Sequence, residues 1–231
     1  MNNNYGIDIW SDGNFIIEDG VTKVNYDCKP SLISIVKDIR KQDFKGPLLL
    51  RFPHITNKQI TTLYDTFNSS INEYDYKGKF NAVFPLKVNQ LPNFIHPLVS
   101  MGKKYNYGLE AGSKAELVIA MTYNNMGSPI TINGFKDKEM IHLCFIAKSM
   151  GHNITIIIEG LNELEMIIEV LKETKLESPN IGLRVRLHSG GSGLWAKSGG
   201  INSKFGLTST EILEAYELME DNNIVKYLTM I

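Results

Sequence analysis

The sequence predicts an α/β fold built on a parallel sheet, and three observations favour this class. From Phe80 onward, strand-like segments recur about every 25–30 residues with helical segments between them. Segments such as ITIII (154–158) and PLLL (47–50) are apolar on both faces, as helix-covered parallel strands are. The 231 residues are 43% hydrophobic and 21% charged, which is enough apolar material for one large core. A doubly wound sheet and a (β/α)₈ barrel both fit.

We expect the repeating strand–helix part of the chain to span residues 46–231. Residues 1–45 form an N-terminal segment outside it. The stretch GNFIIEDGVTKVNY (13–26) predicts a hairpin with Asp19-Gly20 at its turn. The stretch PSLISIVKDIRKQ (30–42) predicts a helix.

Strands and helices then alternate. Pro85 fits its strand only at the C-terminal end, where ladder pairing stops. Gly127 and Gly151 are expected to close the helices that precede them. Apolar residues at i, i+3 and i+4 predict an amphipathic helix that starts at Leu161. The predicted strands are 46–52, 80–88, 104–111, 128–134, 152–160, 180–187 and 224–231, and the predicted helices are 57–74, 91–101, 113–127, 136–150, 161–171 and 208–221.

Composition excludes several classes of function. The net charge of −1 and the pI near 6.5 come from interspersed charges, without the basic stripe of a nucleic-acid binder. Cys28 and Cys144 form no CxxC motif, so reduced thiols in a cytoplasm are expected. The N-terminus lacks signal-peptide character, and the apolar runs are too short to span a bilayer. We therefore expect a soluble, cytoplasmic protein without nucleic-acid or membrane partners.

Lys87 ends an apolar strand, where an unpartnered lysine is unusual. One interpretation is a charge that extends into solvent from the strand end. The other is a Schiff-base lysine, made nucleophilic near neutral pH by partial desolvation against Phe84, Leu86 and Val88. In a barrel, catalytic groups gather at the C-terminal ends of strands, which is where Lys87 falls.

Two acidic residues follow in YGLEAGSKAEL (107–117). Glu110 lies at the C-terminal end of the next strand, so it shares an edge with Lys87; it is either an active-site group or an ordinary loop carboxylate. Glu116 completes the pattern S-x-x-E with Ser113, which is typical of a helix capping box.

Arg184 and Arg186 alternate with apolar residues in a predicted buried strand, so both project to one face. Two such cations need anions, either from a ligand or from a barrel carboxylate. Six glycines follow between Gly190 and Gly206 in a segment that matches no phosphate-binding motif, and a mobile lid and a plain long loop fit equally well. The five histidines show no metal-ligand spacing, so no metal site is predicted, and no G-x-S-x-G of a serine hydrolase occurs.

Four motifs in this order closely resemble those of the biosynthetic arginine decarboxylases: FPLKVNQ (84–90), GLEAGSKAEL (108–117), NGFKDKE (133–139) and GSGLWAKSGGINSKFGL (191–207). These enzymes belong to the alanine-racemase-like class of pyridoxal-phosphate (PLP) enzymes, with ornithine and diaminopimelate decarboxylases. The resemblance runs over nearly the whole chain and implies a PLP-binding TIM barrel, with the N-terminal segment associated with a β-rich domain.

The resemblance also implies roles for individual residues. Lys87 matches the lysine that holds PLP as an internal aldimine. Glu110, Arg184 and Lys204 match positions at or near the cofactor, and Glu116 matches a second acidic position nearby.

The implied reaction converts L-arginine to agmatine and CO₂, a step of polyamine and spermidine biosynthesis. The substrate amine displaces Lys87, PLP takes up the electrons released as CO₂ departs, and Lys87 returns to release the product. The resemblance further allows for Mg²⁺ and implies a homo-oligomer for the full-length enzyme.

Relatives of this kind are more than twice as long as the chain, so about six of the eight barrel strands are expected. The isolated chain is expected to have little or no activity, because later cofactor-binding and catalytic motifs are missing. Two alternatives stay open: a non-catalytic fragment or partner of a full-length decarboxylase, and a decarboxylase of another basic amino acid.

Overall fold

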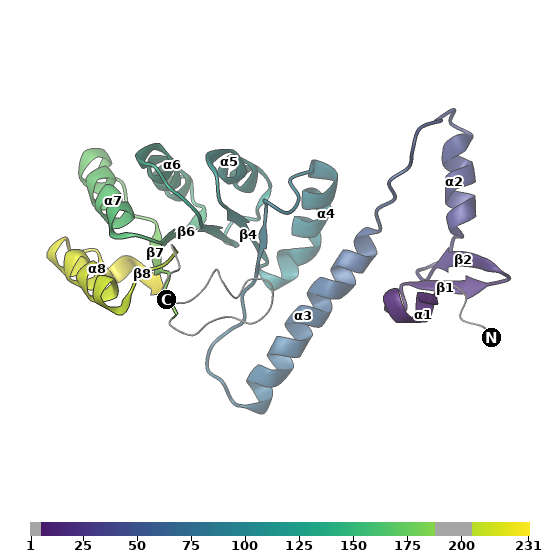
Figure 1. Ribbon diagram of the computed structural model, residues 1–231, viewed down its shortest axis with the longest axis horizontal. Coiled ribbons are helices and arrows are strands. Elements are labelled where there is room, and N and C mark those ends of the chain that lie inside the picture. The colour runs from purple at the N-terminus through teal and green to yellow at the C-terminus, as the bar shows by residue number, and fades with distance from the viewer. Residues whose placement is uncertain (1–5, 188–204) are drawn as a thin grey trace. The chain divides into compact units, whose positions relative to one another are not determined.

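The computed structural model describes residues 6–187 and 205–231, which fall into two compact units, Met1–Leu63 and Tyr64–Ile231 (Figure 1). Helix α3 (Pro53–Glu73) contributes residues to both units. The strand predicted at 46–52 is wrong. These residues form no strand, and Leu49 is 74% exposed, because no neighbouring strand pairs with this proline-containing run.

The N-terminal unit contains the predicted hairpin and helix. Its elements are α1 (Ile7–Trp10), β1 (Phe15–Glu18), β2 (Val21–Val24) and α2 (Leu32–Arg40). The two-residue turn has Asp19 at φ 54° and Gly20 at φ 74°. Positive φ at both central positions matches the right-handed twist of the strands, so the Asp-Gly pair sets the antiparallel register.

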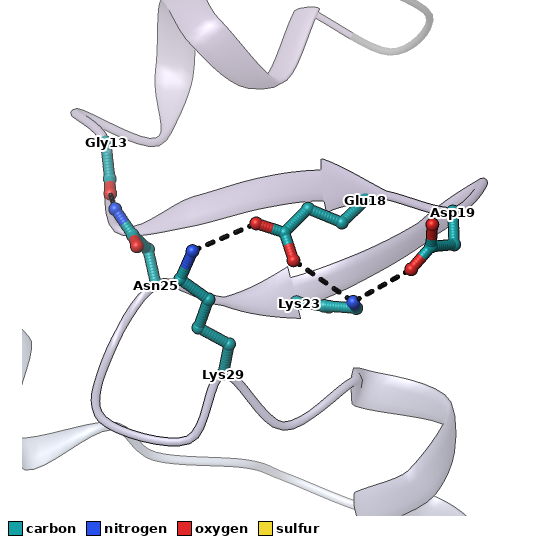
Figure 2. A network of polar contacts seen from close by, with 6 residues as sticks. All are labelled: Gly13, Glu18, Asp19, Lys23, Asn25 and Lys29. Carbon is teal, nitrogen blue, oxygen red and sulfur yellow. Dashed lines mark hydrogen bonds and ion pairs between the residues drawn. The ribbon is translucent and has the colours of Figure 1, made fainter.

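A polar network covers one side of this hairpin (Figure 2). The Glu18 carboxylate accepts hydrogen bonds from Lys23 Nζ at 3.1 Å and Lys29 Nζ at 3.0 Å, and Lys23 also reaches Asp19. These lysines hold the pKa of Glu18 below its ordinary value. Lys29 follows β2, so the network attaches the chain beyond the hairpin to β1.

The second unit is a six-stranded parallel sheet in the order β3-β4-β5-β6-β7-β8. The prediction of about six barrel strands is confirmed. Its strands are β3 (Val83–Pro85), β4 (Gly108–Ala111), β5 (Pro129–Ile132), β6 (Asn153–Ile158), β7 (Asn180–Leu183) and β8 (Leu228–Met230). The outermost strands β3 and β8 each pair with one strand only, so the barrel is open.

Helices lie along one side of this sheet, between its successive strands (Figure 1). They are α4 (Pro92–Gly102), α5 (Lys114–Tyr123), α6 (Lys138–Ser149), α7 (Leu161–Thr174) and α8 (Ser209–Asp221), with 3₁₀ turns η2 (Lys103–Tyr105) and η4 (Val225–Tyr227). The predicted apolar stripe of α7 is confirmed at its centre, since Leu164 and Ile167 are fully buried.

The ends of these helices follow local chemistry. The side chains of Ser113, Asp137 and Thr208 each accept a hydrogen bond from the helix that they precede. Gly151 closes α6 at φ 95°, as predicted. Gly127 does not close α5: the helix ends four residues earlier at Tyr123, and Gly127 lies in the turn before β5.

Two residues of the sheet, Pro85 and Gly108, suit the backbone at their positions. Pro85 is the last residue of β3, where its missing N–H costs no ladder bond, as predicted. Gly108 packs against β5 so tightly that a Cβ there would lie 2.0 Å from the Pro129 carbonyl oxygen. Only glycine fits at this position of the sheet.

Both cysteines are free thiols. Cys28 is exposed, whereas burial raises the pKa of Cys144 to about 12. Across residues 6–187 and 205–231, no helix combines the length and apolar character needed to cross a membrane.

Candidate functional site

The C-terminal ends of β3 and β4 bring Lys87 and Glu110 onto one edge of the sheet. Pro85 and Glu110 are register partners, and Leu86 N–H donates to the Glu110 carbonyl oxygen at 3.0 Å. Lys87 lies in the turn that begins directly after this contact. The predicted placement of both residues at neighbouring strand ends is confirmed.

Of the two interpretations of Lys87, the described residues show the charge that extends into solvent at the strand end, without the partial desolvation of the other. Lys87 is exposed, and Val88 is 66% exposed, while Leu86 alone is fully buried. The strand ends at Pro85, and residues 86–88 form a turn. Within the described ranges, Lys87 Nζ has no hydrogen-bond or ion-pair partner, which leaves the amine accessible.

Glu116 lies in the first turn of α5, near its N-cap residue, and also forms a hydrogen bond to the loop that follows Lys87. The Ser113 hydroxyl accepts from Glu116 N–H at 3.2 Å, which is half of a capping box. The Glu116 carboxylate, however, accepts from Gly112 N–H at 2.7 Å and from Gln90 Nε2 at 3.1 Å. The residue is buried and connects the loops that follow β3 and β4.

The two arginines do not share a buried strand face as predicted, because β7 ends at Leu183. Arg184 is exposed; its Nη1 donates to Glu159 Oε1 at 2.7 Å, and its guanidinium lies over the Phe205 ring. Arg186 Nη2 donates to the Gly206 carbonyl oxygen at 2.9 Å. The ion pair with a barrel carboxylate is therefore the alternative that the structure shows for Arg184.

Lys204 and the glycine-rich stretch up to Gly200 lie outside the described residues, so their predicted roles are carried by the sequence alone.

A cavity of about 710 Å³ is lined by residues from strands β3, β5, β6, β7 and β8. Its walls are mostly apolar; the polar lining residues are Asn81, Thr131, Asn133 and Arg184, and Lys87 and Glu110 are not among them. Thr131 is 7% exposed, and its hydroxyl has no hydrogen-bond partner among the described residues. A buried hydroxyl without a partner is costly and marks a position where a polar ligand group would be stabilised.

The sequence analysis did not single out three charged residues near the C-terminal ends of the strands. They are Glu159, which pairs with Arg184, and Lys136 with Glu163, which form a buried ion pair. Glu159 follows a run of apolar residues, the same signal that singled out Lys87 and Glu110, and could have been found in that way.

Metal ligands do not gather in the described part of the chain. Within residues 6–187 and 205–231 there is no group of three or more His, Cys, Asp or Glu side chains that could hold an ion. The magnesium that the resemblance allows has no support there.

The sequence matches the pyridoxal-dependent decarboxylases over their pyridoxal binding domain, at residues 57–227. This is most of the chain, and the chain belongs to this family.

Among its relatives, the biosynthetic arginine decarboxylase of Bacteroides thetaiotaomicron is 39% identical over 98% of this chain. The crystal structure of the biosynthetic arginine decarboxylase of Campylobacter jejuni is 58% identical over 99% of the chain, with a TM-score of 0.90. Diaminopimelate decarboxylase of M. jannaschii, at 22% identity over 95% of the chain and a TM-score of 0.67, shows likeness of fold. The chain spans 37%, 36% and 47% of these three proteins, respectively.

Proposed function

We propose that this chain supplies the PLP-binding part of an arginine decarboxylase, which converts L-arginine to agmatine and CO₂. The observation that carries the proposal is the exposed Lys87, which has no side-chain partner among the described residues and directly follows the strand paired with the strand of Glu110, within a pyridoxal binding domain. The arginine specificity rests on the names of the Bacteroides thetaiotaomicron and Campylobacter jejuni relatives.

The residues present fit PLP. The aldehyde of PLP requires a free lysine amine, and Lys87 offers one at the edge where the sheet's functional side chains meet. The Thr131 hydroxyl, which has no hydrogen-bond partner in the described part of the chain, and the guanidinium of Arg184 can serve the polar and anionic groups of a ligand, while the apolar cavity wall accommodates a ring. When bound, PLP supplies the electron sink for loss of CO₂.

Residues of this chain would bind the cofactor and orient the groups around it. Lys87 binds the cofactor through Nζ, and Glu110 supplies a carboxylate at the neighbouring strand end. Glu116 restrains the loop that follows Lys87 through Gln90. Arg184 attracts an anionic group, and Glu159 holds its guanidinium in one orientation. Lys204 is included as a cofactor-binding residue because it lies in the motif GSGLWAKSGGINSKFGL (191–207), which resembles that of the biosynthetic arginine decarboxylases.

The test is a chimera in which this chain replaces the matching part of the Campylobacter jejuni enzyme, which is 58% identical to it. We expect the chimera to form agmatine from arginine and to prefer arginine over ornithine, lysine and diaminopimelate. Lys87→Ala should abolish the reaction, whereas Lys172→Ala, at an exposed position on α7, should not. A folded chimera that is inactive, or one that stays active with Lys87→Ala, would contradict the proposal.

The 231 residues alone are expected to form no agmatine, because the open sheet leaves the cavity without the remaining walls of a closed barrel. Agmatine formation by the isolated chain would overturn this expectation.

A second candidate is a non-catalytic partner of a full-length decarboxylase. It is favoured by the two outer strands, which offer unpaired backbone groups to another chain. Size-exclusion chromatography with and without the Campylobacter jejuni enzyme distinguishes the two: co-elution favours the partner, and separate elution excludes it.

A further inference from the structure

The most deeply buried charge in the described residues belongs to Lys136, in the loop between β5 and α6. Its side chain is 0% exposed; Nζ lies 3.1 Å from Glu163 Oε1 and donates to the Gly134 carbonyl oxygen. Glu163, in the first turn of α7, is 6% exposed. Burial of such a pair stabilises a fold little compared with an apolar pair of the same volume, so its presence calls for another reason.

The pair is the first link in a chain of contacts along the C-terminal edge of the sheet. The second oxygen of Glu163 accepts from the backbone N–H of Glu159 at 2.8 Å. Glu159 directly follows β6, its side chain is only 10% exposed, and its carboxylate binds Arg184 Nη1 at 2.7 Å. The contacts thus connect the ends of β5, β6 and β7.

We propose that Lys136 and Glu163 are positioning residues that fix Glu159, and through it hold the Arg184 guanidinium at the edge of the cavity. This inference rests on the proposed function, in which Arg184 attracts an anionic group of the ligand. A long, exposed arginine otherwise samples many rotamers, and an anchored partner removes that freedom before a ligand arrives.

The two halves of the pair have different tasks. Glu163 supplies the acceptor for Glu159 N–H, which an apolar residue cannot do. Burial raises the pKa of Glu163, while the Glu159 N–H and the charge of Lys136 counteract that effect. Lys136 therefore favours the charged carboxylate, the stronger acceptor.

The test compares two double variants of the 231-residue chain by NMR. Lys136→Met with Glu163→Met removes both charges together, so no lone charge stays buried, and it removes the acceptor. Lys136→Met with Glu163→Gln is also neutral but keeps an oxygen for Glu159 N–H. The matched control is Lys138→Met with Glu173→Met, which removes an exposed ion pair between the start of α6 and α7, two residues along the chain from Lys136.

We expect the Met/Met variant to exchange the Glu159 amide and the Arg184 Nη1 hydrogens about tenfold faster than the unsubstituted chain. The Met/Gln variant should exchange at an intermediate rate, because it keeps an oxygen acceptor for Glu159 N–H but loses Lys136 and the carboxylate charge. The control should retain slow exchange at both positions. Unchanged exchange in a folded Met/Met variant would overturn the inference. Should Met/Met fail to fold, exchange at Glu159 and Arg184 as slow in a folded Met/Gln variant as in the unsubstituted chain would overturn it instead.

The same samples separate this inference from the proposed function. Trapping of PLP at Lys87 is measured in parallel: a chain that traps none contradicts the proposed function, while the exchange rates still decide the positioning roles. Where PLP binds, the Met/Met variant should bind it more weakly, and should cause no further loss in an Arg184→Met background.

Discussion

The Thr131 hydroxyl is buried beside the cavity without a partner among the described residues, which is a cost that the unliganded chain bears. Thr131→Val keeps the shape and removes the hydroxyl. We expect the free energy of unfolding to rise by about 1 kcal/mol in urea titrations, because an unsatisfied group is lost. PLP binding should weaken in the same variant.

The control for Thr131 is Thr174→Val. The Thr174 hydroxyl donates to the Val170 carbonyl oxygen at 2.8 Å, so its removal should instead lower stability by about 1 kcal/mol. Equal losses at both positions would show that the Thr131 hydroxyl has a partner.

Gly108 tests the close approach of β4 to β5. Gly108→Ala places a methyl group 2.0 Å from the Pro129 carbonyl oxygen, and neither strand backbone can yield. We expect the free energy of unfolding of Gly108→Ala to fall by about 3 kcal/mol, or the variant to fail to fold, as measured by thermal and urea unfolding.

The matched control is Gly112→Ala just beyond β4, where the nearest atom would lie at an ordinary 3.5 Å. It should unfold close to the unsubstituted chain. A Gly108→Ala variant of normal stability would contradict the strand register described for β4 and β5.

Helix α8 starts with a complete capping box, which makes its stability depend on pH. Glu211 accepts hydrogen bonds from Thr208 N–H and its hydroxyl, which lowers the pKa of Glu211 below its ordinary 4.5. Its contribution to stability is therefore present above pH 4.5 and lost as the pH falls through the lowered pKa.

Glu211→Gln should remove this part of the acid-induced loss of stability, whereas Glu214→Gln, at an exposed position on the same helix, should not. Thr208→Ala should cost about 1 kcal/mol at neutral pH. Urea unfolding followed by circular dichroism between pH 3 and pH 7 measures both effects. Parallel pH profiles for the unsubstituted chain and Glu211→Gln would contradict the capping role.

Local patterns predicted most elements of this fold, and the exceptions share a cause. The hairpin turn at Asp19-Gly20, the strand end at Pro85 and the stripe of α7 each follow from chemistry within a few residues. The segment 46–52 has an equally apolar pattern but forms no strand, because a strand requires a neighbour that no local pattern reports.

In the candidate site too, features set by the local sequence could be predicted and features that depend on tertiary contacts could not. Lys87 and Glu110 could be placed because both follow parallel strands, whose ends share an edge. The Lys136–Glu163 and Glu159–Arg184 pairs could not, since each joins residues about 25 positions apart in sequence whose meeting depends on tertiary packing.

At the scale of the whole molecule, the open sheet predicts self-association of the isolated chain. Strand β8 presents an edge with only β7 as its neighbour, and Thr229 on it is exposed. A charge at a sheet edge disfavours pairing with another chain, so Thr229→Lys should lower the average mass measured by light scattering at high concentration. Thr210→Lys, exposed on α8, is the control and should have no effect. A monomeric unsubstituted chain at all concentrations would contradict this prediction.

The central claim is that this chain binds PLP through Lys87. The most direct measurement is to incubate the 231-residue chain with PLP, reduce it with borohydride, and locate the modified lysine by peptide mass spectrometry. We predict modification concentrated at Lys87, retained in Lys172→Ala and absent in Lys87→Ala. Label spread evenly over the exposed lysines, or the same amount of label in Lys87→Ala, would contradict the claim.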